Sequence, residues 1–230
     1  MSQDSVDVWV VNLLAERANL SAHKSLLSKA EKLRFEGFKN HKQADYYAIS
    51  RSVQKRILAN YLGIDPEFIE FKKGLHGKPE LSGQPWFFNI SHSADRLLIA
   101  VSAFSEVGVD IELLKERGNL SFVVKRCFSS EERQYWLDLS DDNKLQFFYR
   151  FWVAKEAFVK AVGRGLALGM ANCVLRLPSL NGFISVPDVY GVAEGWSLNY
   201  LNIDAAYLAA VVCKTGVYEI NLCRYLTKGA

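Results

Sequence analysis

Charged side chains at short spacings in two stretches of this 230-residue sequence are the ones best suited to chemistry. Asp110 and Glu112 lie two residues apart in "VGVDIELL", and a strand would turn both toward one face. Like charges so close repel, and on so apolar a strand they need a cation to offset the cost. Oxygen ligands with no nearby His or Cys favour a hard ion such as Mg²⁺, bound jointly with a phosphate. A polar strand face exposed to water is the simpler alternative.

A second stretch, "WVAKEAFVKAVGRGL", carries Glu156 and Lys160 one helical turn apart. Apolar residues recur at helical spacing and predict a core face, namely Phe147, Phe151, Ala154, Phe158 and Ala161/Val162. The opposite face carries the pair, yet it is flanked by Trp152, Val153 and Val159. We therefore expect this face to turn toward another part of the protein, with a solvated ion pair as the alternative.

The third stretch runs from residue 75 to residue 96 and contains "LHGKPEL" and "PWFFNISHSADR". Gly77-Lys78-Pro79 predicts a turn that presents a cation, "WFFNI" a strand, and "SHS" a loop. Ser91, His92 and Ser93 offer donors suited to phosphate oxygens. A Ser–His nucleophile is a competing reading, but no GxSxG elbow accompanies it. A structural or surface histidine is the plain alternative.

The elements that position these residues belong to an ordinary folded chain. Half of the residues are hydrophobic and 23% are charged, and no apolar run reaches the roughly 20 residues that span a bilayer. The first twenty residues contain acids instead of a basic n-region, so we expect a first strand and no signal peptide. The net charge of +3 is too small to indicate nucleic-acid binding. Nine Lys/Arg against three acids between His23 and Arg56 could receive an anionic ligand or form a solvated helix face.

The four cysteines predict reduced thiols, because they are widely spaced and form no CxxC motif; they are Cys127, Cys173, Cys213 and Cys223. We expect most of them to be buried in a cytoplasmic protein.

Two segments about a hundred residues apart resemble each other. "DYYAISRSVQKRILANYLG" (45–63) matches "LQFFYRFWVAKEAFVKAVG" (145–163), and "LSKAEKLRF" (27–35) matches "FSSEERQYW" (128–136). Apolar strands close each half at 96–102 and 207–213. This predicts an α+β fold of two similar halves, residues 1–105 and 106–230, each with a helix on a small antiparallel sheet. A ligand cleft between the halves would explain the apolar frame of Glu156 and Lys160.

In this order, "GKPEL", "FNISHS", "GVDIE" and "WVAKEAFVKAVGRGL" resemble the Sfp-type 4'-phosphopantetheinyl transferases over most of the chain. The resemblance implies two similar α+β halves related by a pseudo-twofold, with coenzyme A and Mg²⁺ in the cleft between them. It implies that Asp110, Glu112 and Glu156 are the Mg²⁺ ligands and that Lys160 contacts the pyrophosphate. Glu156 and Lys160 are then the catalytic residues, with Glu156 as the candidate base.

For coenzyme A, the resemblance implies that Ser91 and His92 contact phosphate, together with Asp110 and Lys160 at the pyrophosphate. Lys78 is expected beside the adenine nucleotide and Arg51 at the 3'-phosphate. Lys32 and Arg34 are expected to help, in a register that the sequence does not fix. Two departures are small: "WVAKEA" replaces the KES form, and Arg164 stands where Lys is commoner.

The implied reaction moves the phosphopantetheine arm of coenzyme A to a serine of an apo acyl or peptidyl carrier protein. We expect a cytoplasmic monomer that binds neither nucleic acid nor membrane. A non-catalytic coenzyme A-binding module and an Mg²⁺-dependent pyrophosphohydrolase are the alternatives. The module would be expected to lack a carboxylate, whereas the hydrolase would need no carrier.

Overall fold

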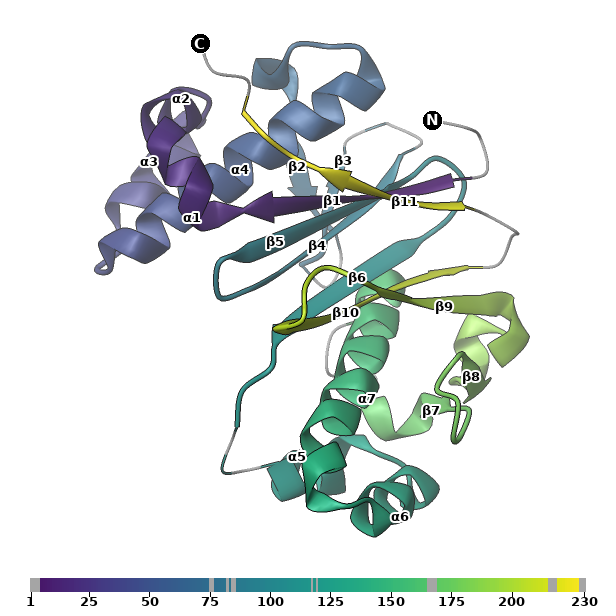
Figure 1. Cartoon of the computed structure of the whole chain (residues 1–230). Helices are drawn as coiled ribbons and strands as arrows, with labels where there is room; N and C mark the ends of the chain where they lie inside the picture. Colours follow the sequence, from purple (N-terminus) through teal and green to yellow (C-terminus); the bar gives the residue numbers. More distant parts are fainter. Residues whose placement is uncertain are drawn as a thin grey trace.

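The computed structural model describes residues 5–74, 77–81, 83, 86–116, 118, 120–164, 169–214 and 219–227. Its elements form two series in the same order (Figure 1). The first is β1 (Ser5–Asn12), α1 (Leu13–Glu16), η1 (Arg17–Asn19), α2 (Leu20–Ser25), α3 (Lys29–Glu36), α4 (His41–Leu62), η2 (Pro66–Phe68), β2 (Phe71–Lys73), β3 (Pro79–Leu81), β4 (Phe87–Ser93) and β5 (Arg96–Ser102). The second is β6 (Val107–Leu113), α5 (Leu120–Cys127), α6 (Ser130–Asp138), α7 (Asp141–Val162), η4 (Met170–Asn172), β7 (Val174–Leu175), β8 (Phe183–Ser185), η5 (Asp188–Tyr190), η6 (Ala193–Gly195), β9 (Trp196–Leu201) and β10 (Tyr207–Lys214), followed by β11 (Glu219–Arg224).

Two sheets pack face to face between two long helices. The strand order is β11-β1-β5-β4 in one sheet and β6-β10-β9 in the other. Alternate residues of β5 serve two cores: Leu98 and Ala100 face the other sheet, whereas Leu97, Ile99 and Val101 face α4. α7 covers the outer face of the second sheet (Figure 1). The layers are therefore helix, sheet, sheet, helix, and the predicted α+β class is confirmed.

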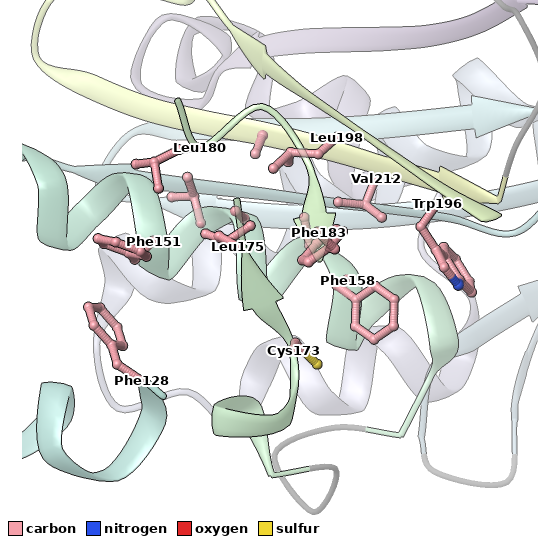
Figure 2. Packing of buried hydrophobic residues seen from close by; sticks show 14 of the residues in the cluster. Phe128, Phe151, Phe158, Cys173, Leu175, Leu180, Phe183, Trp196, Leu198 and Val212 are labelled. Atoms are coloured by element: carbon pink, nitrogen blue, oxygen red, sulfur yellow. The ribbon is translucent and has the colours of Figure 1, made fainter. Parts of the chain in front are cut away.

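The aromatic core beneath α7 shows how the second half fixes that helix. Phe151 and Phe158 point from α7 toward the β7–β8 hairpin and the second sheet (Figure 2). Phe158 packs edge-on against Trp196, with ring centroids 4.9 Å apart, and Phe151 packs against Phe128 at 4.8 Å. These contacts bury the predicted apolar face of α7 and leave the opposite face toward the other half.

The internal repeat extends to the helix ends. Ser28 with Glu31 in α3, and Ser129 with Glu132 in α6, each form a complete capping box. α4 and α7 are both 22 residues long. Each ends at a glycine in the left-handed conformation, Gly63 and Gly163, with φ of 64° and 70°.

A buried lysine repeats as well and ties each long helix to the short helix before it. Lys55 Nζ lies 2.9 Å from Glu31 Oε2, and Lys155 Nζ lies 2.6 Å from Glu132 Oε2. The same glutamates close the capping boxes, so one carboxylate fixes both the start of the short helix and the position of the long one. Lys155 and Glu132 are completely buried.

The last strand departs from the predicted organisation. β11 pairs in parallel with β1, in register from Ser5–Glu219 to Val10–Arg224, so the first sheet is mixed and not purely antiparallel. The second-half sheet is antiparallel as predicted. The division into 1–105 and 106–230 stays a prediction, except that β11 lies on the sheet of the first half (Figure 1). None of the described helices is long and apolar enough to cross a membrane.

Candidate active site

A cleft of about 1150 Å³ lies between the two halves and collects residues from both. α7 presents Trp152, Glu156 and Lys160 to it, four residues apart and all partly exposed. The second half also supplies Asp110 and Glu112 from β6, and the first half supplies residues of α3, α4, β2 and β4. The face of α7 that carries the Glu–Lys pair thus lines an interface, which accounts for its apolar neighbours.

Gly108 sets the distance between α7 and β6. A Cβ at this position would lie 2.0 Å from Ala157 O and 2.3 Å from Ala161 N, far closer than atoms pack. Only glycine lets the helix backbone approach the strand here. This contact brings the start of "GVDIE" against the end of α7, so that Asp110 meets Lys160.

Asp110 lies at the centre of the described contacts. Its Oδ1 accepts from Lys160 Nζ at 2.6 Å and from Ser91 Oγ at 2.8 Å. Its Oδ2 is buried and has no hydrogen-bond partner among the described residues. Burial raises the pKa of Asp110, and the Lys160 ammonium opposes that rise. One buried carboxylate oxygen is therefore available to a ligand.

Glu156 lines the same cleft and is partly exposed. Burial, and next the charge of Asp110, raise its pKa to about 7. Glu112, the neighbour of Asp110 on β6, accepts from Ser93 Oγ at 3.0 Å. Three carboxylates thus line the same cleft with Lys160 among them.

Oxygen atoms are the donors that a hard cation such as Mg²⁺ prefers, and the unpartnered oxygen of Asp110 fits one. Among the described residues, however, no three carboxylate, imidazole or thiol side chains already converge as a metal cluster. The Lys160 ammonium lies among these groups and pairs with Asp110 Oδ1 at 2.6 Å. Asp110 Oδ2 stays open to a cation while this pair is intact.

The prediction that "SHS" lies in a loop is wrong. The "SHS" segment is the end of a strand and not a loop, so its side chains alternate between two faces. Ser91 is buried and contacts Asp110, Lys160 and the amide of Ile111, so its hydroxyl is fully used by the protein. His92 is exposed and lines the cleft. Both residues line the cleft, and their contact with phosphate stays a prediction.

The first-half wall of the cleft is basic and aromatic. Arg51 lines it, with Nε 3.2 Å from Glu31 Oε1 and its guanidinium 4.5 Å from the ring centre of Phe71. Arg34 also lines the cleft and lies over the ring of Tyr47. The remaining cations and rings of this wall are Lys42, Lys72, Phe38 and Tyr46. The predicted basic stretch thus contributes Arg34, Lys42 and Arg51 to a wall whose chemistry suits an anion.

Lys78 and Lys32 do not line this cleft, and their roles toward coenzyme A stay predictions. Lys78 Nζ donates to Ala161 O at 2.9 Å and to Val107 O at 3.2 Å, outside the cleft lining. Burial lowers its pKa to about 8. The turn presents Gly77 and Pro79 to the cleft, and the lysine instead links α7 to β6. Lys32 is exposed and does not line the cleft, because it lies on the solvent side of α3.

Several residues of the site could not be predicted from the sequence motifs. Tyr46, Tyr47 and Phe71 line the cleft, and their only sequence signal is aromatic spacing next to lysines and arginines. Lys155 of "WVAKEA" has a position within the core, where its ammonium pairs with Glu132. Of the "GRGL" exit, Arg164 is exposed, whereas Gly165 and Leu166 lie outside the described residues.

Comparison with known proteins agrees with this architecture. Residues 106–212 match the 4'-phosphopantetheinyl transferase superfamily, and residues 15–104 match a 4'-phosphopantetheinyl transferase N-terminal model. The chain is 32% identical over 212 residues to the 4'-phosphopantetheinyl transferase HetI of Nostoc sp., covering 90% of this chain and 87% of that protein. The chain therefore belongs to the 4'-phosphopantetheinyl transferase superfamily, a family of enzymes.

Relatives in other organisms match a smaller share of this chain. A 4'-phosphopantetheinyl transferase of Bacillus subtilis is 35% identical over 133 residues, 56% of this chain and 58% of that protein. The L-aminoadipate-semialdehyde dehydrogenase-phosphopantetheinyl transferase of Mus musculus is 28% identical over 205 residues, 80% of this chain and 66% of that protein. These relatives support the recognition made from the four motifs.

Proposed function

We propose that this chain transfers the 4'-phosphopantetheine group of coenzyme A to a serine of an apo acyl or peptidyl carrier protein, in an Mg²⁺-dependent reaction. The observation that carries the proposal is the single cleft in which the three carboxylates and Lys160 face a basic, aromatic wall. The wall suits a nucleotide with phosphates, and the carboxylates suit a hard cation at a pyrophosphate.

Asp110, Glu112 and Glu156 would hold Mg²⁺, with the buried Oδ2 of Asp110 as one ligand. When bound, the ion would neutralise charge on the pyrophosphate and polarise it toward attack. Arg51 and His92 would bind the phosphates of the nucleotide end, and Arg34 would assist. The resemblance to the family implies that the phosphate bound by Arg51 is the 3'-phosphate of coenzyme A.

In the reaction, the serine oxygen of the carrier forms a bond to the phosphorus that bears the pantetheine arm. The bond from that phosphorus to the bridging oxygen breaks, and adenosine 3',5'-bisphosphate leaves with the electron pair. Lys160 moves from Asp110 to the pyrophosphate and compensates the charge that the leaving phosphate gains. Glu156, with a pKa of about 7 in the free chain, accepts the serine proton.

Transfer is tested by incubating the protein with apo carrier, coenzyme A and Mg²⁺ and recording the intact mass of the carrier. We expect a gain of one phosphopantetheine on the carrier serine. Release of free phosphopantetheine without a carrier would show a pyrophosphohydrolase instead. Binding of coenzyme A with no turnover on several apo carriers would show a non-catalytic module.

We further propose a monomer, because one chain supplies both sides of the cleft. The widely spaced cysteines, expected to be reduced thiols, support the proposal of a cytoplasmic protein. Size-exclusion chromatography with light scattering at micromolar concentration checks the oligomeric state. An apparent mass twice that of the 26.0 kDa chain would contradict the proposal.

A further inference from the structure

The edge of β6 that faces away from β10 is bound by side chains of β4. Oxygen atoms from alternate β4 residues accept hydrogen bonds from alternate β6 amides, at donor–acceptor distances of 2.9 to 3.4 Å. The pairs are Val109 N with Asn89 Oδ1, Ile111 N with Ser91 Oγ, and Leu113 N with Ser93 Oγ. Three side chains thus replace the carbonyls of a neighbouring strand and join the first half to the second.

Two of these side chains make a second contact in the same geometry. Ser91 Oγ donates to Asp110, and Ser93 Oγ donates to Glu112 at 3.0 Å. Each serine therefore accepts from the amide of one β6 residue while donating to the carboxylate of the residue before it. Asn89 has no such second contact, since the residue before Val109 is Gly108.

The two hydrogen bonds together fix the direction in which the serine hydroxyl donates its proton. Its lone pair is engaged by a β6 amide, so its proton is directed at the carboxylate. The side chain of Glu112 rotates about three torsions. The Ser93 hydroxyl is held by an amide of β6, the strand that carries Glu112, so its hydrogen bond restricts these torsions. We propose that Ser93 is a positioning residue that holds the carboxylate of Glu112 in its orientation for the metal, with Ser91 acting equally on Asp110. This inference rests on the proposed function, in which Glu112 is a metal ligand.

Ser93 gives the cleaner test, because Ser91 also contacts Lys160. The probe is Mn²⁺, titrated by electron paramagnetic resonance into protein with coenzyme A and without carrier. We expect Ser93→Ala to weaken Mn²⁺ binding about 10- to 100-fold, as for loss of a residue that orients a metal ligand. Ser93→Thr, which keeps the hydroxyl, restores the affinity to within about threefold of wild type on the same scale.

Asn89→Ala is the matched control, since it removes a β4–β6 hydrogen bond without touching a carboxylate. Hydrogen exchange of the ligand-free protein should speed up at the Val109 amide in Asn89→Ala and at the Leu113 amide in Ser93→Ala. Mn²⁺ affinity should fall in Ser93→Ala only. An equal fall in both variants would assign the effect to strand register, and an unchanged affinity in Ser93→Ala would overturn the proposal.

The two proposals fail in different ways. If wild-type protein modifies the carrier and Ser93→Ala binds Mn²⁺ normally, only the positioning role is wrong. If wild-type protein with coenzyme A binds no Mn²⁺, the metal ligands are wrong, and the role of Ser93 falls with them.

Discussion

Glu156 combines burial, a neighbouring carboxylate and access to the cleft, and its protonation therefore affects both stability and turnover. Its pKa of about 7 lies above the ordinary value of 4.5, so the folded chain holds this proton more tightly than the unfolded chain does. The contribution of Glu156 to stability therefore falls as pH rises from about 4.5 to about 7, and the loss stays constant at higher pH. Acidification through the same window restores it.

Glu156→Gln keeps the shape and removes this charge. We expect the ligand-free variant to be more stable than wild type at pH 8, by about 1 to 3 kcal/mol, and equally stable at pH 4. Turnover should fall about 100-fold or more, as for loss of a positioned acid–base group. Urea unfolding in EDTA and carrier mass kinetics measure the two effects. Wild-type turnover in this variant would show that Glu156 on α7 takes no part in the reaction.

Arg51 permits a test of which phosphate the basic wall receives. Its guanidinium is held by Glu31 and Phe71, so it is already oriented before any ligand binds. We expect Arg51→Ala to weaken coenzyme A by about 1.5 to 3 kcal/mol, the range for a hydrogen bond to a charged group. Dephospho-coenzyme A should lose far less. Calorimetric titration of both ligands decides the matter, because equal losses would remove Arg51 from the 3'-phosphate.

At the level of the elements, two ion pairs tie each long helix to the short helix before it, Lys55–Glu31 and Lys155–Glu132. They are alike in geometry but differ in their surroundings. Glu132 is completely buried and its ion-pair partner in the described structure is Lys155. Glu31 is partly exposed and pairs with both Lys55 and Arg51. Removal of Lys155 therefore leaves the buried Glu132 without this ion pair, whereas removal of Lys55 leaves Glu31 paired with Arg51.

We expect Lys155→Met to destabilise the protein by about 3 to 5 kcal/mol, because a buried carboxylate is left uncompensated. Lys55→Met should cost less than half of that, since Arg51 still faces Glu31. Urea unfolding of both variants at pH 7 provides the comparison. Equal losses would show that burial of the glutamate does not govern the effect.

The elements and their repeat could be predicted from the sequence because periodicity and capping residues are local signals. The Ser–Glu spacing of both capping boxes and the glycines after both long helices are visible in the sequence. The parallel pairing of β11 could not be predicted in this way, since a strand partner more than 200 residues away leaves no local pattern.

For the site, spacing was sufficient to place Asp110 and Glu112 on one strand and Glu156 and Lys160 on one helix turn. It was not sufficient to predict the contacts that Ser91 and Lys78 make within the protein. The direction of the Ser91 side chain depends on whether "SHS" is strand or loop. The direction of the Lys78 side chain depends on the carbonyls of Val107 and Ala161, which the packing of Gly108 against α7 brings together. Such contacts arise only in the tertiary fold.

At the scale of the whole molecule, charge governs how a carrier would approach. The chain has a net charge of +3, and many of its cations lie in the first half, on α3 and at the start of α4. We expect the KM for an acidic carrier to rise several-fold between about 50 mM and 300 mM salt, because exposed charges are screened within about 10 Å at 0.1 M. The Kd for coenzyme A should change less in the same titration. A carrier KM that ignores salt would indicate an apolar docking surface.

The parallel pair of β1 and β11 also determines how the chain resists tension. Force applied at residues 5 and 227 draws β1 and β11 along their lengths in opposite directions, so that all six registered pairs are loaded in shear together. Glu16 and Thr227, joined by a hydrogen bond, extend the contact beyond the strands. Handles at residues 5 and 105 instead peel β1 from antiparallel β5, starting at Val6–Ser102. In a single-molecule pulling measurement, the first pair of handles should therefore need the larger rupture force.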